Sequence, residues 1–259
     1  MAERATARMR RCSAVRMTHG SNADDRTPSC RNLPDAVLED LERLGTRCQF
    51  AEGDVLIREG DHAQDLVVLR EGLVKVSGRL NGGDQARLMD IRIARDVLGE
   101  LSTMTLKPRS ATVVACGDVT AAVIPWSELQ PFLIEYPEAA LALYRLSCER
   151  LRRSDRWRLE FGGYPVKVRL ARVLVELAES YGEWGPRSVR IDVNLTQSEF
   201  AALTGCGTRA VQQAFAHLRD AGVISTGSWR IFVCKPDQLR EEAQLPSRRL
   251  PGVMSRNPH

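Results

Sequence analysis

Residues 195–222 read LTQSEFAALTGCGTRAVQQAFAHLRDAG and have the pattern of two short helices joined by a tight turn. Thr196 is followed three residues later by Glu199, which is the spacing of a capping box at the start of a helix. Gly205 then allows a sharp turn, because glycine adopts backbone conformations that strain other residues. We therefore expect one helix to begin after Thr196 and a second to follow Gly205-Cys206.

The second helix of this pair has an inward and an outward face. Val211, Phe215 and Leu218 are spaced to point inward, toward Phe200 and Leu203 of the first helix. The outward face of the second helix consists of Thr208, Arg209, Gln212, Gln213 and Ala216, with no acidic residue. Because arginine can form two parallel hydrogen bonds with guanine, and glutamine with adenine, this face is predicted to read DNA. A winged domain used for protein contacts is the alternative.

The flanking segments complete the order of a winged helix-turn-helix domain. Residues 166–182 have the pattern of an amphipathic helix, residues 189–194 that of a short strand, and residues 223–234 that of two strands around Thr226-Gly227. Phosphate contacts give affinity without sequence information. They are expected from Thr196, Lys167, Arg169, Ser228 and Arg230.

The N-terminal half has a different pattern of apolar and turn-forming residues. A short amphipathic helix is predicted at 33–45, followed by β-rich runs at 55–57, 66–78, 86–91, 111–115 and 120–124. Glycine, asparagine and aspartate turn signals separate these runs. Short strands with regular turns predict an antiparallel sandwich or barrel.

A long helix is predicted between the two halves. After a short helix within 126–137, Pro137 suits a first helical position, and neither proline nor glycine interrupts the chain to about Phe161. Leu141, Tyr144, Cys148 and Leu151 form an apolar seam at spacings of three and four. Pairing with a twin helix is a natural use for such a seam, and burial on its own domain is the alternative. A hinge is expected at 162–166.

Composition narrows the protein class. The chain has 259 residues, 43% of them hydrophobic, and a formal net charge of +4. Its seven cysteines are scattered, and none lies in a C-x-x-C pair, which indicates reduced thiols in a cytoplasmic protein. No apolar run approaches the roughly 18 residues needed to span a membrane. Residues 1–31 resemble a disordered basic tail, and residues 241–259 a flexible tail.

Three motifs in this order resemble the Crp/Fnr family of bacterial transcription regulators. The runs FAEGDVLIREGD (50–61) and LVVLREGLVKV (66–76) are similar to the start of that family's cyclic-nucleotide-binding β-roll. Residues 99–113, GELSTMTLKPRSATV, resemble its phosphate-binding cassette, and 195–225 its DNA-binding helices. The resemblance implies an α+β protein that is not an enzyme. Its expected parts are a sensory β-roll (32–136), a dimerisation helix (137–161) and a winged helix-turn-helix domain (167–240).

The resemblance also implies a ligand set. A cyclic phosphate carries one negative charge, which Arg109 can pair with and to which Ser110 can donate a hydrogen bond. We therefore expect Arg109→Leu to abolish ligand binding and to leave the fold intact. Glu100 can accept from the ribose hydroxyl within the Gly99–Glu100–Leu101 turn. On the long helix the resemblance adds Arg150 and the base-contacting pair Ser154 and Asp155, although Asp155 replaces a hydroxyl and Thr103 and Leu106 also depart from the usual cassette.

The implied partners are the protein itself, as a homodimer, and double-stranded DNA. A near-palindromic operator would have half-sites about 34 Å apart. The implied effector is cyclic AMP or another cyclic nucleotide, with no required cofactor or metal, and family members commonly touch RNA polymerase. Arg209 and Gln213 replace a glutamate and an arginine of the best-known relatives, which predicts a changed operator. Gly207 replaces the usual serine cap, so Thr208 is expected to cap the second helix.

Four alternatives remain at this point. One is a regulator that needs no ligand, whose degenerate roll only scaffolds the dimer. Another is a redox or iron–sulfur regulator, but Cys12, Cys30 and Cys48 are each 18 residues apart, unlike the tight spacing such clusters need. Haem sensing has only His62 as a candidate ligand. An enzyme is disfavoured because the sequence has neither a Walker loop nor a nucleophile elbow.

Overall fold

The computed structural model describes residues 33–79, 86–186, 188–227 and 230–246. The predicted N-terminal tail (1–31) lies outside the described residues, as does most of the predicted C-terminal tail (241–259). The first described element is the expected amphipathic helix, α2 (Asp35–Leu44), whose Val37, Leu38 and Leu41 are buried. Among the described residues, no helix combines the length and apolarity needed to cross a bilayer.

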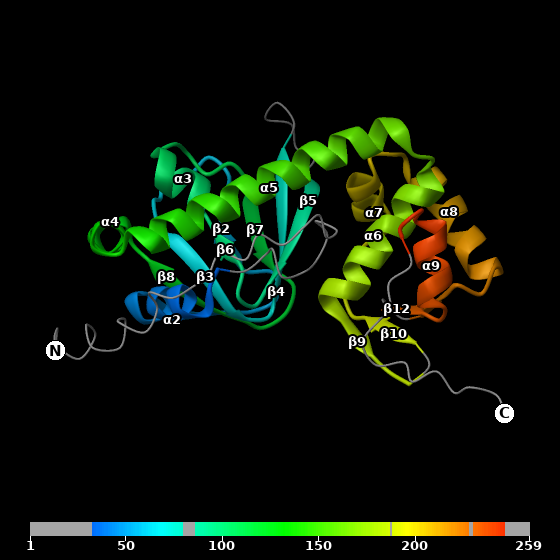
Figure 1. Cartoon of the computed structure of the whole chain (residues 1–259), viewed down its shortest axis with the longest axis horizontal. Coiled ribbons are helices and arrows are strands. Elements are labelled where there is room, and N and C mark those ends of the chain that lie inside the picture. The colour runs from blue at the N-terminus through cyan, green and yellow to red at the C-terminus, as the bar shows by residue number, and fades with distance from the viewer. Residues whose placement is uncertain (1–32, 80–85, 187, 228–229, 247–259) are drawn as a thin grey trace. The chain divides into compact units, whose positions relative to one another are not determined.

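Two four-stranded antiparallel sheets follow (Figure 1). One has the order β1 (Thr46–Phe50), β8 (Val119–Ile124), β3 (Leu66–Glu71), β6 (Val97–Leu98). The other has the order β2 (Val55–Ile57), β7 (Thr112–Ala115), β4 (Leu73–Arg79), β5 (Ala86–Ile93). The predicted antiparallel β domain is confirmed, together with each of the β-rich runs on which it was based. Strands β1 and β6 were not predicted.

Strand β3 shows how the sequence builds two apolar layers. All four residues of its run LVVL are buried. Successive side chains of a strand point to opposite faces, so both faces of this strand must be covered. Val67 and Leu69 join an apolar cluster with residues of β2, β4 and β7 in the opposite sheet. Leu66 and Val68 join a second cluster with α2 and with helices α4 (Trp126–Glu135) and α5 (Pro137–Gly163). This strand therefore lies between the inter-sheet core and a helical layer.

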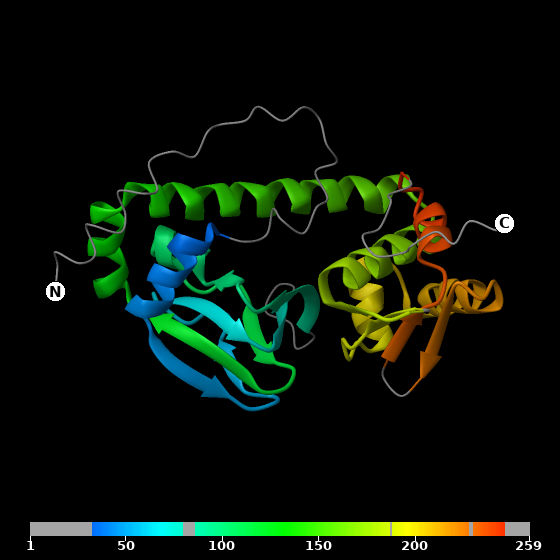
Figure 2. The ribbon, with the colours of Figure 1, turned by 60° about the horizontal axis from the view of Figure 1, so that its bottom comes forward.

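Helix α5 is longer than the sequence indicated (Figure 2). The expected hinge at 162–166 is wrong in its first two residues, because Gly162 and Gly163 continue the helix. The helix ends at Gly163, and the next residue, Tyr164, is extended with φ −120° and ψ 144°. Pro165 explains this, since a proline disfavours helical geometry in the residue before it. Glycine lowers helix stability without forbidding the helix.

The two sides of α5 differ in burial. Ala139, Ala142, Leu143 and Leu146 are buried against the roll. The predicted seam lies elsewhere on the helix and is open in the single chain: Leu141 is 46% exposed, Tyr144 66% and Leu151 60%. The alternative that this seam is buried on its own domain is therefore wrong.

The C-terminal part has the predicted winged helix-turn-helix order. Helix α6 (Val166–Tyr181) precedes the helix pair α7 (Gln197–Thr204) and α8 (Thr208–Asp220). A four-stranded sheet has the order β11 (Ile224–Gly227), β12 (Arg230–Val233), β10 (Val189–Ile191), β9 (Gly182–Trp184). Strand β9 and the final helix α9 (Pro236–Glu242) were not predicted.

The helix pair confirms the capping box and corrects one cap. Thr196 is the N-cap of α7, and its side chain and that of Glu199 make the two reciprocal bonds of the motif. Thr208 does not cap α8, contrary to the expectation, because Gly207 already has the extended N-cap conformation and Thr208 is the first helical residue. The rings of Phe200 and Phe215 meet edge to face with centroids 5.0 Å apart, which fixes α7 on α8.

Candidate functional site

The cassette at 99–113 contains a short helix that was not predicted from the sequence, α3 (Glu100–Thr105). Gly99 precedes it with φ +79°, a left-handed conformation suited to glycine. A Cβ at this position would lie only 2.3 Å from Nη1 of Arg109 and 2.9 Å from the carbonyl oxygen of Asp65. Both the backbone conformation and the space around it therefore require glycine here.

Arg109 lies beneath this turn, only 5% exposed. Its Nη1 donates to Ser102 Oγ at 2.7 Å and to the Gly99 carbonyl at 3.1 Å, and its Nη2 donates to the Asp65 carbonyl at 2.7 Å. Burial lowers the pKa of Arg109 below its ordinary value, against the opposing effect of Asp65 and Glu100. The side chain thus also holds the cassette together, which corrects the expectation that its loss would leave the fold intact.

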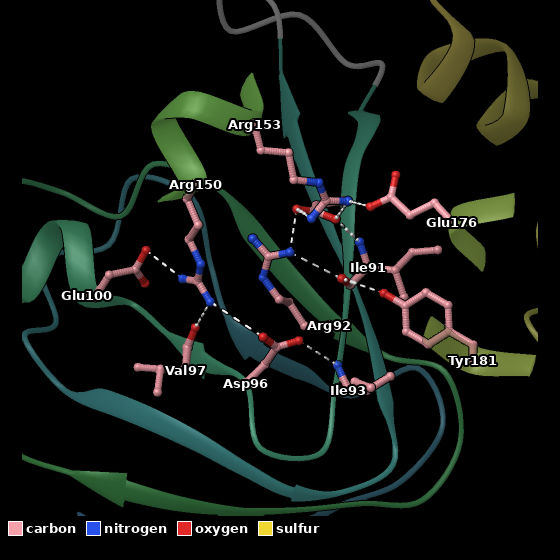
Figure 3. Close-up of polar contacts among 11 residues, drawn as sticks. Ile91, Arg92, Ile93, Asp96, Val97, Glu100, Arg150, Arg153, Glu176 and Tyr181 are labelled. Atoms are coloured by element: carbon pink, nitrogen blue, oxygen red, sulfur yellow. Dashed lines mark hydrogen bonds and ion pairs between the residues drawn. The ribbon is translucent and has the colours of Figure 1, made fainter. Parts of the chain in front are cut away.

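An ion pair links the cassette to α5 (Figure 3). Glu100 Oε1 lies 2.7 Å from Nη1 of Arg150, and both side chains are largely buried. Nη2 of Arg150 donates to the Val97 carbonyl at 2.7 Å and lies 3.7 Å from Asp96. The carboxylate predicted to bind a ribose hydroxyl is therefore fixed by an arginine of the long helix.

A cavity of about 380 Å³ lies between the cassette, the second sheet and α5. Seven of the eight predicted ligand residues line it: Gly99, Glu100, Leu101, Arg109, Ser110, Arg150 and Ser154. Asp155 is not part of this lining, and its exposed side chain pairs with Arg158 at 3.3 Å. Two segments that are far apart in the sequence thus line one cavity.

Part of the cavity lining was not predicted from the sequence. Asp90 and Arg92 come from β5, and Ser147, Arg153 and Trp157 from α5. Asp90 accepts from Nη1 of Arg92, from the Ile91 amide and, at 3.4 Å, from Arg153, which also bonds Glu176 (Figure 3). Helical spacing from Arg150 could have indicated Arg153 and Trp157, three and seven residues further on. Four arginines against two carboxylates make this lining attractive to an anion.

The predicted DNA-reading face is open on α8. Thr208, Arg209, Gln212 and Gln213 are exposed, whereas Val211, Phe215 and Leu218 are buried, as predicted. Among the described residues, Arg209 has no hydrogen-bond or ion-pair partner. The helix therefore has the division of faces that a recognition helix needs.

The residues predicted to contact phosphates differ from one another in their exposure and in their partners. Thr196 is exposed at the start of α7. Arg230 is exposed and pairs with Asp192 at 2.8 Å, and Lys167 lies 3.9 Å from Glu242. Arg169 donates to the Gly205 carbonyl at 3.4 Å, while Ser228 lies outside the described residues.

The thiols and metal-binding side chains of the described region do not cluster. Cys48, Cys116, Cys148, Cys206 and Cys234 are free thiols. Within 33–246, apart from the gaps noted above, no three His, Cys, Asp or Glu side chains are grouped to hold a metal ion.

Comparisons with known proteins agree with this organisation. Residues 47–136 match the cyclic nucleotide-binding domain family, and residues 168–242 match the Crp-like helix-turn-helix domain family. The chain is 27% identical over 195 residues to a CRP-like cAMP-activated global transcriptional regulator of Mycobacterium tuberculosis, covering 75% of this chain and 87% of that protein. It is 28% identical over 212 residues to the anaerobic regulatory protein of Bacillus subtilis, covering 80% and 88%.

A solved structure extends the agreement to the fold. A CRP/FNR-family transcriptional regulator from Thermus thermophilus superposes with a TM-score of 0.65 at 22% identity, covering 77% of this chain and 98% of that one. At this level of identity the likeness concerns the fold alone.

Proposed function

Because the chain belongs to the Crp/Fnr family of transcription regulators, we propose that it is a homodimer whose binding to its operator is controlled by a cyclic nucleotide in the roll. The observation that carries this proposal is the convergence of the cassette and α5 on one cavity lined by excess positive charge. Neither segment could be placed beside the other from sequence spacing alone. Their meeting provides a phosphate-binding turn beside the helix that also carries the dimer seam.

Each part of a cyclic nucleotide has a partner in this proposal. The phosphate pairs with Arg109 and accepts from Ser110, and the ribose hydroxyl donates to Glu100. The base lies toward β5 and the Arg150–Trp157 stretch of α5, both of which line the cavity. Cyclic AMP and cyclic GMP are the ligands to test first, by calorimetry on the full chain. Heat of binding with micromolar affinity supports the proposal, and no heat with either one contradicts it.

The dimer is proposed from the exposed seam on α5. Leu141 and Tyr144 lie on the part of the helix that the roll leaves uncovered, and Leu151 is 60% exposed although it also lines the cavity. A twin helix would bury these side chains and place two recognition helices on one DNA duplex. Asp155 follows the seam on the same helix, so it is proposed to act near the dimer interface. Contact with RNA polymerase and a cytoplasmic location belong to the same proposal.

A ligand-independent regulator is the second candidate, and one observation favours it. Arg109 already donates hydrogen bonds to the backbone carbonyls of Gly99 and Asp65 without any ligand. Glu100 and Arg150 already form an ion pair with each other. A roll whose charged groups are already paired can support the dimer without binding an effector. The calorimetry separates the two candidates, because a scaffold alone would release no heat with a cyclic nucleotide and would show no ligand-induced rise in melting temperature.

Replacing Arg209 with alanine tests the DNA-reading face. A bidentate arginine–guanine contact contributes about 1–3 kcal/mol of discrimination, so affinity for an operator obtained by selection should fall by that amount. Affinity for random DNA should change much less. The measurement is fluorescence anisotropy at fixed salt with both DNAs.

Arg219→Ala is the matched control, because Arg219 is an exposed arginine of the same helix outside the predicted contacts. It should alter binding to both DNAs slightly and equally. An equal loss on operator and random DNA for Arg209→Ala would instead make Arg209 a phosphate contact.

A further inference from the structure

Arg92 on β5 is a cavity-lining residue that none of the functions above uses. Its side chain is only 11% exposed. Both of its hydrogen bonds start at Nη1, one to the Asp90 carboxylate and one to the Ile91 carbonyl at 3.3 Å (Figure 3). Nε is buried without a partner, and Nη2 has no acceptor among the residues that the structure describes.

This arrangement leaves the N–H groups on Nε and Nη2 of the guanidinium without acceptors among the residues that the structure describes. Of the five N–H groups of an arginine, the two on Nη1 account for both observed bonds. A buried donor without an acceptor is unfavourable, and an acceptor supplied by a bound molecule removes that penalty. The position of Arg92 in the lining therefore favours a ligand that presents acceptors to β5.

Arg92 is also held in place before any ligand arrives. Asp90, its partner, additionally accepts from the Ile91 amide at 2.8 Å and from Arg153 at 3.4 Å. Burial alone would lower the pKa of Arg92, but the nearby carboxylates of Asp90 and Asp96 outweigh it and raise that pKa, so the group stays charged. A fixed, charged donor recognises a ligand at a smaller entropic cost than a mobile one.

The surrounding walls indicate which part of the ligand meets Arg92. Val76, Met89, Leu98, Leu151 and Trp157 also line the cavity. Such apolar walls suit the flat faces of a nucleobase better than a second phosphate, which would lose its hydration there. With the phosphate assigned to Arg109 and Ser110 of the cassette, the base is the part left for β5.

The two purines differ in what they offer an arginine. Guanine presents two neighbouring acceptors, O6 and N7, which arginine binds with two parallel hydrogen bonds. Adenine presents N7 beside an amino group, which is a donor and would face the donors of Arg92. We propose that Arg92 is a specificity-determining residue that selects guanine, and that the effector is cyclic GMP. This inference rests on the proposed function, namely that the cavity binds a cyclic nucleotide.

Calorimetry on the full chain with four cyclic nucleotides tests the inference. Cyclic GMP should bind about 5- to 150-fold more tightly than cyclic AMP. Cyclic IMP keeps O6 and N7 and lacks only the 2-amino group, so it should bind like cyclic GMP. The 7-deaza analogue of cyclic GMP has a C–H in place of N7 and should lose most of the preference.

Two variants and a control assign the preference to Arg92. Arg92→Leu should bring the affinity for cyclic GMP down to that for cyclic AMP. Arg92→Lys keeps a positive charge beside Asp90 but lacks the planar fork, so it should also lose most of the preference while better preserving the fold. Arg87→Leu removes an exposed arginine of the same strand outside the cavity and should keep the full preference.

The outcomes separate this inference from the proposed function. Binding of both nucleotides with equal affinity, or tighter binding of cyclic AMP, overturns the guanine assignment and leaves cyclic-nucleotide control standing. A preference for cyclic GMP that survives in both Arg92 variants also overturns it. Binding of none of the four nucleotides to the unaltered protein contradicts the proposed function and the inference together.

Discussion

Replacing Arg109 with leucine should weaken cyclic-nucleotide binding about 100-fold or more, since each hydrogen bond to a charged group contributes about 1.5–3 kcal/mol. The same change removes one donor from each of two backbone carbonyls, those of Gly99 and Asp65, which keep other donors from Thr103. Each lost hydrogen bond to the charged guanidinium costs about 1.5–3 kcal/mol, so the free energy of unfolding should fall as well. Calorimetry measures the first effect and urea denaturation the second.

Arg58→Leu is the control for this prediction, because Arg58 is an exposed arginine of the roll outside the cavity lining. It should leave both ligand affinity and stability close to those of the unaltered protein. Ser102→Ala removes one acceptor of Arg109 without removing its charge, so it should lower affinity far less than Arg109→Leu. An Arg109→Leu protein that binds ligand with unchanged affinity would remove the cassette from the proposed site.

Placing glutamates at both Leu141 and Leu151 should convert the dimer to monomers. The two substitutions remove four leucines from each dimer, and burial of one leucine contributes about 1.5–3 kcal/mol. The dimer dissociation constant should therefore rise about 1,000-fold or more. Analytical ultracentrifugation over a range of concentrations measures it in the absence of any ligand, so the place of Leu151 in the cavity lining does not affect the result.

Ile134→Glu is the matched control for the dimer prediction. Ile134 is an even more exposed apolar residue, 73% exposed, and lies on α4 rather than on the seam. This variant should remain dimeric. A Leu141→Glu, Leu151→Glu protein that sediments like the Ile134→Glu protein would show that the seam is not the dimer interface.

The fold was largely predictable because its elements carry their own patterns. The run LVVL predicts strand β3, and the apolar stripe predicts helix α8, from a few neighbouring residues alone. Tertiary packing then buries the residues that the pattern contains. Strand β1, by contrast, reads TRCQF and is half exposed, and β6 has only two residues, so neither had a hydrophobic pattern to detect. The cap expected at Thr208 failed because Gly207 adopts the N-cap conformation without any side chain.

The site was predictable only where a motif carried it. Gly99, Glu100, Arg109 and Ser110 lie within one short stretch whose spacing resembles a known cassette. Asp90 and Arg92 reach the same cavity through the pairing of β4 with β5, which depends on strand register rather than on any local pattern. The backbone bonds of Arg109 were unforeseeable for the same reason, since Asp65 is 44 residues away in sequence.

The most direct test of ligand control is the affinity of the full-length dimer for its selected operator, measured by fluorescence anisotropy with and without saturating cyclic nucleotide. If the cavity controls the recognition helices, the ligand should raise that affinity about 5- to 150-fold. The operator should raise the affinity for the nucleotide by the same factor, because such coupling is reciprocal. Identical operator affinities with and without a nucleotide that calorimetry shows to be bound would contradict the account.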